Sequence, residues 1–417
     1  MAKATARVLS LPTAADIAEE SERMGIDPTI LRDLAGALGT EAIKMEGVPA
    51  QVATALQGMI SPPAGLAVVA SGSGTDDPNP QASVPSHDFP HVLIAGSKPL
   101  LLDVASRLES AGEDGKAVAA EIRSGLERSE GRQLGTTSCG NLTFEWGKRS
   151  YVMGIINVTP DSFSGDGLGK NVDAAFAQAE RFVQAGVDIL DVGGESTRPG
   201  HEEVPEEEER DRVVPVVRRL VSEMSVPVSV DSYRLLVVRD ALEAGAHMVN
   251  DVWGLRRTEG LGELAASYGV PVVLMHNRQG EATRTQLGGH FRQVQYRDVM
   301  GEIVQGLRES VDLALQGGIR WENVIVDPGI GFGKTPEQNL VVMRRLRELK
   351  SLGRPILMGT SRKSVIGLTL GVPADDRVEG TAATVAMSIC NGADIVRVHD
   401  VKEMVRISRM TDAIVRA

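Results

Sequence analysis

Two glycine-rich stretches in the C-terminal half of the chain combine an ionisable side chain with several backbone N–H groups. One reads DPGIGFGK (residues 327–334) and the other reads MGTSRKS (residues 358–364). Each follows a short apolar run and precedes a helical pattern, which is where an α/β barrel carries its chemistry. Because glycine lets the backbone approach a ligand closely, Asp327, Lys363 and these N–H groups predict a site for a small molecule.

Acidic and amide side chains end other apolar runs. Asp231 closes the run VSVD, and Asn250 stands beside Asp251 at the end of MVND. A carboxylate accepts hydrogen bonds from a ring N–H and an amino group together, whereas asparagine both donates and accepts. Asp231, Asn250 and Asp327 on one mouth therefore match the edge of a heterocycle such as a pterin or guanine. Lys363 is placed to donate to the carbonyl oxygen of that ring.

A second group of side chains suits an anion and a metal. Arg397 and His399 stand two residues apart in a strand-like run, so they share one face. Thr197 and Arg198 in the run ESTRPG suit a phosphate oxygen or a carboxylate. Asn157, at the end of MGIIN, offers a carbonyl ligand for Mg²⁺, and an asparagine that only caps the turn is the less favoured alternative. These residues predict a site for a polyphosphate and its metal.

Other features of this half are less specific. His276 follows the run VVLM and fits a core or loop histidine as well as a ligand, whereas Met275 is expected to pack against a planar ligand. The run GIGFG (residues 329–333) lacks the glycine spacing of a dinucleotide-binding fold. Cys139 and Cys390 fit no metal spacing and are expected to be free thiols.

The elements that position these residues alternate between strand and helix eight times from residue 151 onward. The expected strands end near Asn157, Glu195, Asp231, Asp251, His276, Asp327, Thr360 and His399. The expected helices include residues 172–185, 206–224, 234–244, 336–349 and 378–391. Eight units over roughly 260 residues match a TIM (β/α)8 barrel, and continuous apolar strands are typical of parallel sheets buried on both faces. An α/β barrel is therefore favoured over an open doubly wound sheet.

Residues 1–138 follow a different pattern and predict a small α+β domain. Helices are expected at 13–25, 28–38, 49–60, 98–110 and 117–133, strands at 42–48, 65–70 and 91–95, and a mobile Gly/Ser/Asp/Pro-rich loop at 71–90. No catalytic pattern appears there, and the sequence gives the segment no role. After a linker at 135–140, residues 142–146 and 148–152 predict a β-hairpin that closes the bottom of the barrel domain, residues 139–417.

Composition limits the possible partners. The formal net charge of −12 disfavours nucleic acid and anionic membranes as partners. No stretch approaches the roughly 20 apolar residues of a membrane span, and the N-terminus lacks the apolar core of a signal peptide. We therefore expect a soluble cytoplasmic protein.

From about residue 142 to its end, the chain resembles the dihydropteroate synthases of folate biosynthesis. The resemblance rests on several motifs in order, of which the most specific are MGIINVTPDSFSGDG, DVGGESTRPG, DPGIGFGKT, GTSRKS and RVEGTAATVAMSICNGADIVRVHDV. It implies a transferase that condenses 6-hydroxymethyl-7,8-dihydropterin pyrophosphate with 4-aminobenzoate, giving 7,8-dihydropteroate and pyrophosphate. It also implies inhibition by sulfonamides, which reproduce the arylamine.

The resemblance assigns roles to matching residues. Asp231, Asn250, Asp327 and Lys363 would hold the pterin, Asn157 would ligate Mg²⁺, and Thr197, Arg397 and His399 would bind pyrophosphate. Ser364 would meet the aminobenzoate carboxylate. The first loop would form a lid over the site, and Phe163 on that lid would shield the reacting centre. That loop reads DSFSGDG here, whereas the family commonly has DSFSDGG, so neither Asp161 nor Asp166 receives a fixed role.

Two other functions share parts of this pattern. A pterin-dependent methyltransferase on the same barrel would keep the Asp and Asn contacts but has no use for pyrophosphate ligands such as Arg397 and His399. A non-catalytic pterin-binding regulator would be expected to lack Asn157 or Lys363, and both are present. The synthase is therefore favoured, and a homodimer is expected.

Overall fold

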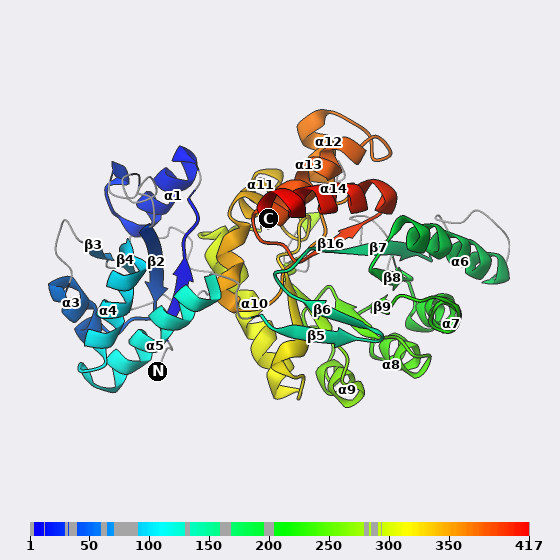
Figure 1. Cartoon of the computed structure of the whole chain (residues 1–417), viewed down its shortest axis with the longest axis horizontal. Coiled ribbons are helices and arrows are strands. Elements are labelled where there is room, and N and C mark those ends of the chain that lie inside the picture. The colour runs from blue at the N-terminus through cyan, green and yellow to red at the C-terminus, as the bar shows by residue number, and fades with distance from the viewer. Residues whose placement is uncertain are drawn as a thin grey trace. The chain divides into compact units, whose positions relative to one another are not determined.

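The computed structural model describes residues 4–11, 13–29, 32, 40–59, 65–70, 91–129, 134–158, 168–195, 204–278, 283–284, 291–292 and 294–416. The chain forms two compact units (Figure 1). The first is Met1–Gln133 with Arg347–Gly353, and the second is Leu134–Leu346 with Arg354–Ala417. The division falls after residue 133 rather than after residue 138, and the short segment 347–353 belongs with the first unit.

The second unit is a (β/α)8 barrel, which confirms the predicted fold. Its parallel strands are β7 (Tyr151–Asn157), β8 (Ile189–Gly193), β9 (Val228–Asp231), β10 (Met248–Asp251), β11 (Val272–Met275), β14 (Val324–Asp327), β15 (Leu357–Met358) and β16 (Ile395–Val398). They pair in the order β14-β11-β10-β9-β8-β7-β16-β15. A parallel bridge between Val326 and Ile356 joins the two ends of that order and closes the barrel.

Helices surround these strands (Figure 1). They are α6 (Leu168–Ala185), α7 (Glu206–Glu223), α8 (Leu235–Glu243), α9 (Leu261–Tyr268), α10 (Val299–Gln316), α11 (Pro336–Arg344), α12 (Ser364–Leu370), α13 (Val378–Cys390) and α14 (Val401–Val415), with 3-10 turns η3 (Trp321–Asn323) and η4 (Leu346–Leu352). Short β12 (Thr283–Arg284) and β13 (Phe291–Arg292) pair with each other. Because helices cover the outside and side chains fill the inside, every residue of β10, β11 and β14 is buried.

A β-hairpin closes the bottom of the barrel, but its strands differ from the predicted ones. β5 (Thr136–Cys139) pairs with β6 (Leu142–Glu145), so the stretch taken as a linker is the first strand, and Tyr151 begins β7 instead. A two-residue turn joins the strands, and Gly140 supplies its positive φ of 57°. The buried hairpin residues Cys139 and Phe144 share one core cluster with Met153, Ile189, Met248, Val273, Ile325, Leu357 and Ile395 of the barrel strands.

The first unit is α+β, as predicted. Its antiparallel sheet has the order β1 (Thr5–Val8), β2 (Thr40–Glu46), β4 (His91–Ser97), β3 (Gly65–Ala70). Its helices are α1 (Ala14–Met24), α3 (Ala50–Met59), α4 (Lys98–Leu108) and α5 (Gly112–Ser129). Strand β1 was not predicted, because TARV is too short to show a period. The loop predicted at 71–90 and most of the helix predicted at 28–38 lie outside the described residues.

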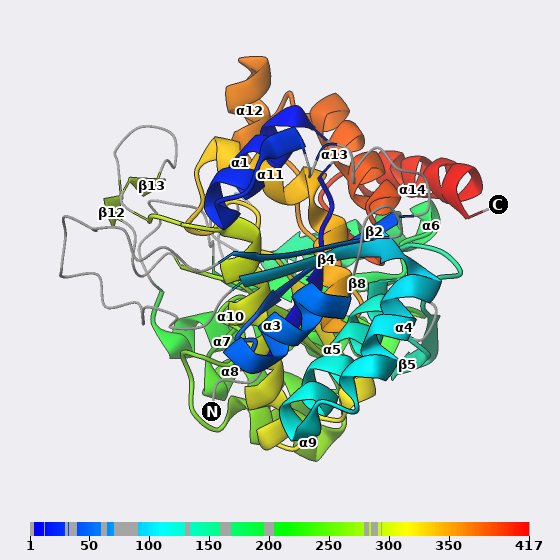
Figure 2. The same ribbon diagram turned by 90° about the vertical axis from the view of Figure 1, so that its left-hand side faces the viewer.

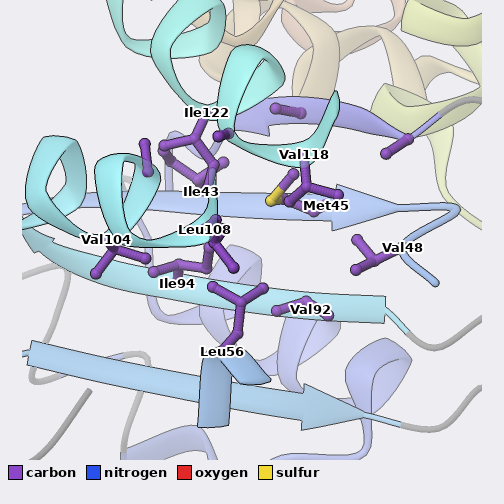
Figure 3. Packing of buried hydrophobic residues seen from close by; sticks show 14 of the residues in the cluster. Ile43, Met45, Val48, Leu56, Val92, Ile94, Val104, Leu108, Val118 and Ile122 are labelled. Atoms are coloured by element: carbon purple, nitrogen blue, oxygen red, sulfur yellow. The ribbon is translucent and has the colours of Figure 1, made fainter. Parts of the chain in front are cut away.

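Alternation along the strands divides the core of this unit between the two faces of the sheet. Ile43 and Ile94 pack with helix residues such as Leu108 and Ile122 on one face (Figure 3). Leu93 packs with Ile17 and Met24 of α1 on the other. Figure 2 shows α1 on the opposite side of β2 and β4 from α4 and α5. The sheet is therefore covered on both faces.

Buried charges also hold the first unit together. Lys44 donates to Glu20 at 2.8 Å, and Arg7 donates to Glu348 at 2.7 Å. All four side chains are at least 94% buried. Glu348 belongs to η4, so a segment distant in the chain contributes to this unit. Within the described residues, no helix combines the length and the apolar character needed to cross a membrane.

Candidate active site

The carboxyl ends of the barrel strands bring together most of the predicted residues that the structure describes. Asp231 ends β9, and the parallel register places Asn250 of β10 directly opposite it. Met275 of β11 is likewise opposite Asp327, which ends β14. Because neighbouring parallel strands end at the same edge, these four side chains come from one rim of the barrel.

Arg397 of β16 reaches across this rim to two carboxylates. Its Nε donates to Oδ2 of Asp191 at 2.6 Å, and its Nη2 donates to Oδ2 of Asp231 at 2.5 Å. Asn250 Nδ2 donates to the same Oδ2 of Asp191 at 3.0 Å. Asp191, on β8, is fully buried and thus organises residues from two other strands. Asp191 was not predicted from the sequence, because it lies inside an apolar run and not at the expected strand end near Glu195.

Burial dominates the electrostatics of the three acidic strand ends. It raises the pKa of Asp231 to about 7, and the neighbouring Asp191 adds to that rise, whereas Arg397 and Lys363 oppose it. Burial also raises the pKa of Asp327 to about 6, against the N–H of Gly329 and the charge of Lys363. Asp251 has its pKa raised to about 6 in the same way. Burial therefore makes these three carboxyl groups easier to protonate than an exposed aspartate.

The loop that follows Asp327 wraps around a buried lysine. Lys334 Nζ donates to the carbonyl oxygens of Gly329 at 3.0 Å and Phe332 at 3.2 Å, and lies 3.1 Å from Nδ1 of His276. Gly329 has φ 70°, and a Cβ there would lie 2.1 Å from the carbonyl oxygen of His276, so only glycine fits. Its N–H donates to Asp327 at 2.7 Å. His276 and Lys334 are therefore supports for the loop.

The second glycine-rich loop presents Lys363. Arg362 adopts a positive φ of 55°, and its Nε donates to Asp400 Oδ2 at 3.0 Å. This turn places Lys363 at the N-cap of α12, with Nζ 4.4 Å from the ring centroid of Phe332. Ser364 is the first residue of that helix. The two loops singled out in the sequence therefore meet at Lys363 and Phe332.

An apolar cluster and a histidine complete the described rim. Met275 is buried in one cluster with Tyr233, Val252 and Phe332, with Trp253 packed beside them. These side chains form an apolar surface beside the acidic strand ends. The role predicted for Met275, packing against a planar ligand, stays a prediction. On the far side of the rim, Nδ1 of His399 lies 3.0 Å from Oγ of Ser361.

Some predicted residues are not tested by these contacts. Phe163, Thr197, Arg198, Asp161 and Asp166 lie outside the described residues.

Asn157 ends β7 and is partly buried. It stands opposite Gly193, which in turn stands opposite Asp231, so the three occupy one row across β7, β8 and β9. In the part of the chain that the structure describes, no group of three or more His, Cys, Asp or Glu side chains could hold a metal ion.

Comparison with known proteins identifies the family that this barrel resembles. A family model described as pterin binding enzyme matches residues 153–399. A dihydropteroate synthase from Clostridium beijerinckii is 47% identical over 278 residues, covering 66% of this chain and 98% of the relative. The chain belongs to the dihydropteroate synthase family. A solved dihydropteroate synthase from Clostridium difficile, in the presence of pteroic acid, is 48% identical with a TM-score of 0.61, covering 66% of this chain and all of that one.

A further relative concerns the first unit. A probable bifunctional folylpolyglutamate synthase/dihydropteroate synthase from Haloferax volcanii is 42% identical over 335 residues, covering 78% of this chain and 39% of the relative. That length exceeds what residues 134–417 contain, so the match continues into the N-terminal unit. The unit is therefore shared, at least in part, with another member of the dihydropteroate synthase family.

Proposed function

We propose that the protein condenses 6-hydroxymethyl-7,8-dihydropterin pyrophosphate with 4-aminobenzoate to form 7,8-dihydropteroate and pyrophosphate. The observation that carries this proposal is the rim on which Asp231, Asn250 and Asp327 stand beside Arg397. The first three offer the acceptors and donors that the amide and amino edge of a pterin needs. Arg397 supplies a fixed positive charge for the pyrophosphate.

The wall beside these groups suits a flat ring. Met275 and Phe332 are buried in one apolar cluster, and a polarisable thioether packs well against an aromatic face. Lys363 lies next to Phe332, from where it would donate to the carbonyl oxygen of the pterin. Ser364, one residue further on, would donate to the carboxylate of 4-aminobenzoate, with Arg198 and Phe163 contributing from the first two loops.

The reaction needs a stabilised leaving group rather than a protein nucleophile. The C–O bond to pyrophosphate breaks with its electron pair leaving on oxygen, and the arylamine nitrogen then bonds to the pterin methylene and loses a proton. Arg397, His399 and Thr197 would bind the departing anion, while the carboxylates of Asp231 and Asp327 would stabilise the cationic pterin.

Mg²⁺ is the metal that this chemistry calls for. The amide oxygen of Asn157 is a hard ligand in line with Asp231, and Mg²⁺ commonly takes few protein ligands, with waters and phosphate oxygens completing its shell. When bound, the metal would supply positive charge to the pyrophosphate oxygens. An asparagine oxygen fits this role, because the substrate polyphosphate and waters would supply the remaining oxygen ligands.

We further propose a cytoplasmic homodimer. Large apolar side chains are exposed on three helices of the barrel, among them Leu370 (55%) on α12, Met387 (50%) on α13, and Met410 (63%) and Ile414 (68%) on α14. Helix α13 packs against both α12 and α14, so these residues lie on neighbouring elements. Exposed apolar side chains on adjoining helices are typical of a surface that pairs with a second copy.

The direct test is turnover. Purified protein incubated with the pterin pyrophosphate, 4-aminobenzoate and Mg²⁺ is expected to yield dihydropteroate and pyrophosphate in equal amounts, measured by chromatography and a pyrophosphate assay. Arg397→Met should abolish both. Absence of product from the folded wild-type protein, together with methyl transfer from a methylated folate, would favour the methyltransferase instead.

A further inference from the structure

The side chain of Asp191 makes an unusual set of contacts for a carboxylate inside a strand. It is fully buried, and one of its oxygens, Oδ2, accepts from both Arg397 Nε and Asn250 Nδ2. The other oxygen, Oδ1, is buried and has no hydrogen-bond partner among the residues that the structure describes. Because a buried carboxylate oxygen without a donor is costly, Oδ1 is a favourable acceptor for one more donor.

The guanidinium of Arg397 shows the complementary feature. Its Nε and Nη2 form one edge, which usually pairs with both oxygens of a single carboxylate. Here the two nitrogens of that edge donate to different carboxylates, Nε to Asp191 and Nη2 to Asp231. Moving Nη2 from Asp231 to Oδ1 of Asp191 would complete an ordinary two-bond pair.

We propose that Asp191 is a positioning residue. When the pterin ring donates hydrogen bonds to Asp231, Nη2 of Arg397 leaves Asp231 and donates to Oδ1 of Asp191 instead. The inference rests on the proposed function, in which the ring N–H and amino groups require the oxygens of Asp231. Arg397 would therefore be paired with a carboxylate both before and after the pterin binds, and its Nη1 would be left to donate to the pyrophosphate oxygens. Asp191 thus links the binding of the ring to the placement of the charge that meets the leaving group.

Asp191 also sets the orientation of Asn250. Because Nδ2 of Asn250 donates to Asp191, the amide oxygen of Asn250 is left to accept from the ligand. Without Asp191, the guanidinium would have no carboxylate once Asp231 engaged the pterin, and a buried charge that loses its partner is strongly destabilised. Without Asp191, binding of the pterin ring would have to break the Arg397–Asp231 ion pair with no replacement for it, and the ring should bind more weakly.

The test is the variant Asp191→Asn, with Asp188→Asn as matched control. Asp188 precedes β8 and pairs with Arg149 at the other end of the barrel, so its loss removes a carboxylate without touching the rim. In Asp191→Asn, Nη2 loses its second acceptor. We expect the KM for the pterin pyrophosphate and the Kd for pteroic acid to rise about tenfold or more, the scale of one hydrogen bond to a charged group. The KM for 4-aminobenzoate should stay unchanged.

The pH profile separates this role from a purely structural one. Asp231 is faced by Arg397 of β16, Asp191 of β8, Asp251 of β10 and Lys363 before α12. Neutralising Asp191 removes a negative neighbour and lowers the pKa of Asp231. The acid limb of kcat/KM should therefore move to lower pH. A general loss of stability would instead shorten the acid side of the profile.

A second measurement needs no variant and so remains decisive if Asp191→Asn does not fold. A crystal structure of the wild-type protein with pteroic acid is expected to show Nη2 of Arg397 on Oδ1 of Asp191 and Asp231 on the ligand. An enzyme that makes dihydropteroate while Arg397 still pairs with Asp231 in that complex would overturn the exchange and leave the proposed function standing. Unchanged KM values and an unshifted acid limb in Asp191→Asn would do the same.

Discussion

Replacing Lys363 by methionine removes one positive charge from the rim with little change in packing. The lysine stem lies beside Gly331, and its Nζ is 4.4 Å from the ring centroid of Phe332. Methionine keeps a flexible apolar stem of similar length, so these contacts survive. The charge itself lowers the pKa of both Asp231 and Asp327. The substitution therefore changes electrostatics at the rim more than it changes its shape.

The expected loss can be worked from two effects. A hydrogen bond to a charged group contributes about 1.5–3 kcal/mol, and removing a preorganised donor typically costs about 10²–10³ in kcat. We therefore expect kcat/KM to fall about 10²–10³-fold, equivalent to ~3–4 kcal/mol. Without Lys363 the pKa values of Asp231 and Asp327 rise above about 7 and about 6, so their ionised forms are lost at higher pH. The acid limb should move to higher pH, opposite to its shift in Asp191→Asn.

The assay is the initial rate of dihydropteroate formation across the neutral pH range, with circular dichroism as a check on folding. Lys402→Met is the matched control, because Lys402 is exposed on α14. A Lys363→Met protein with near-normal kcat/KM and an unmoved acid limb would refute the assignment of Lys363 to the reaction.

Two other predictions concern ligands. Sulfonamides should inhibit competitively with 4-aminobenzoate, because they reproduce its arylamine, and purely non-competitive kinetics would separate the amine site from Lys363 and Ser364. Removal of Mg²⁺ by a chelator should abolish turnover until Mg²⁺ is returned. Asn157→Ala should then require at least about tenfold more Mg²⁺, since even the loss of a residue that only supports a metal ligand changes metal affinity about 10–100-fold. An identical Mg²⁺ requirement in variant and wild type would remove Asn157 from the metal site.

The strand ends could be predicted from the sequence because a closed barrel directs them all to one rim. Asp231, Asn250, Asp327 and Arg397 each follow or occupy a short apolar run, and the register of parallel strands then brings them together. The alternation of strand and helix was enough for this, since each βα unit is local in sequence.

Residues that act through others could not be predicted in this way. Asp191 lies inside an apolar run, and its importance depends on side chains from β10 and β16 that reach it only in the folded barrel. Lys334 follows glycines that suggest a ligand loop, yet its ammonium is buried under that loop. An ionisable residue within a strand buried on both faces was the available signal for Asp191.

The role of the first unit can be tested by truncation, and the structure determines where to cut. A chain beginning at Gly140 would lose β5, including Thr137, whose hydroxyl accepts from Trp146 Nε1 at 2.9 Å. Leu134 is therefore the better start. The cut also removes the partners of Glu348, which accepts from Arg7 at 2.7 Å and from the N–H of Ser10 at 3.0 Å.

We expect residues 134–417 to keep kcat/KM within a few-fold of the full chain, since every residue assigned a role lies at or beyond Asn157. The melting temperature should fall, because segment 347–353 loses the unit with which it clusters. Arg7→Met in the full chain isolates that effect. It breaks a buried ion pair, which should cost about 3–5 kcal/mol in the free energy of unfolding while leaving kcat/KM unchanged. Kinetics, urea unfolding and size-exclusion chromatography measure these outcomes, and a folded but inactive 134–417 fragment would mean that the first unit takes part in the reaction.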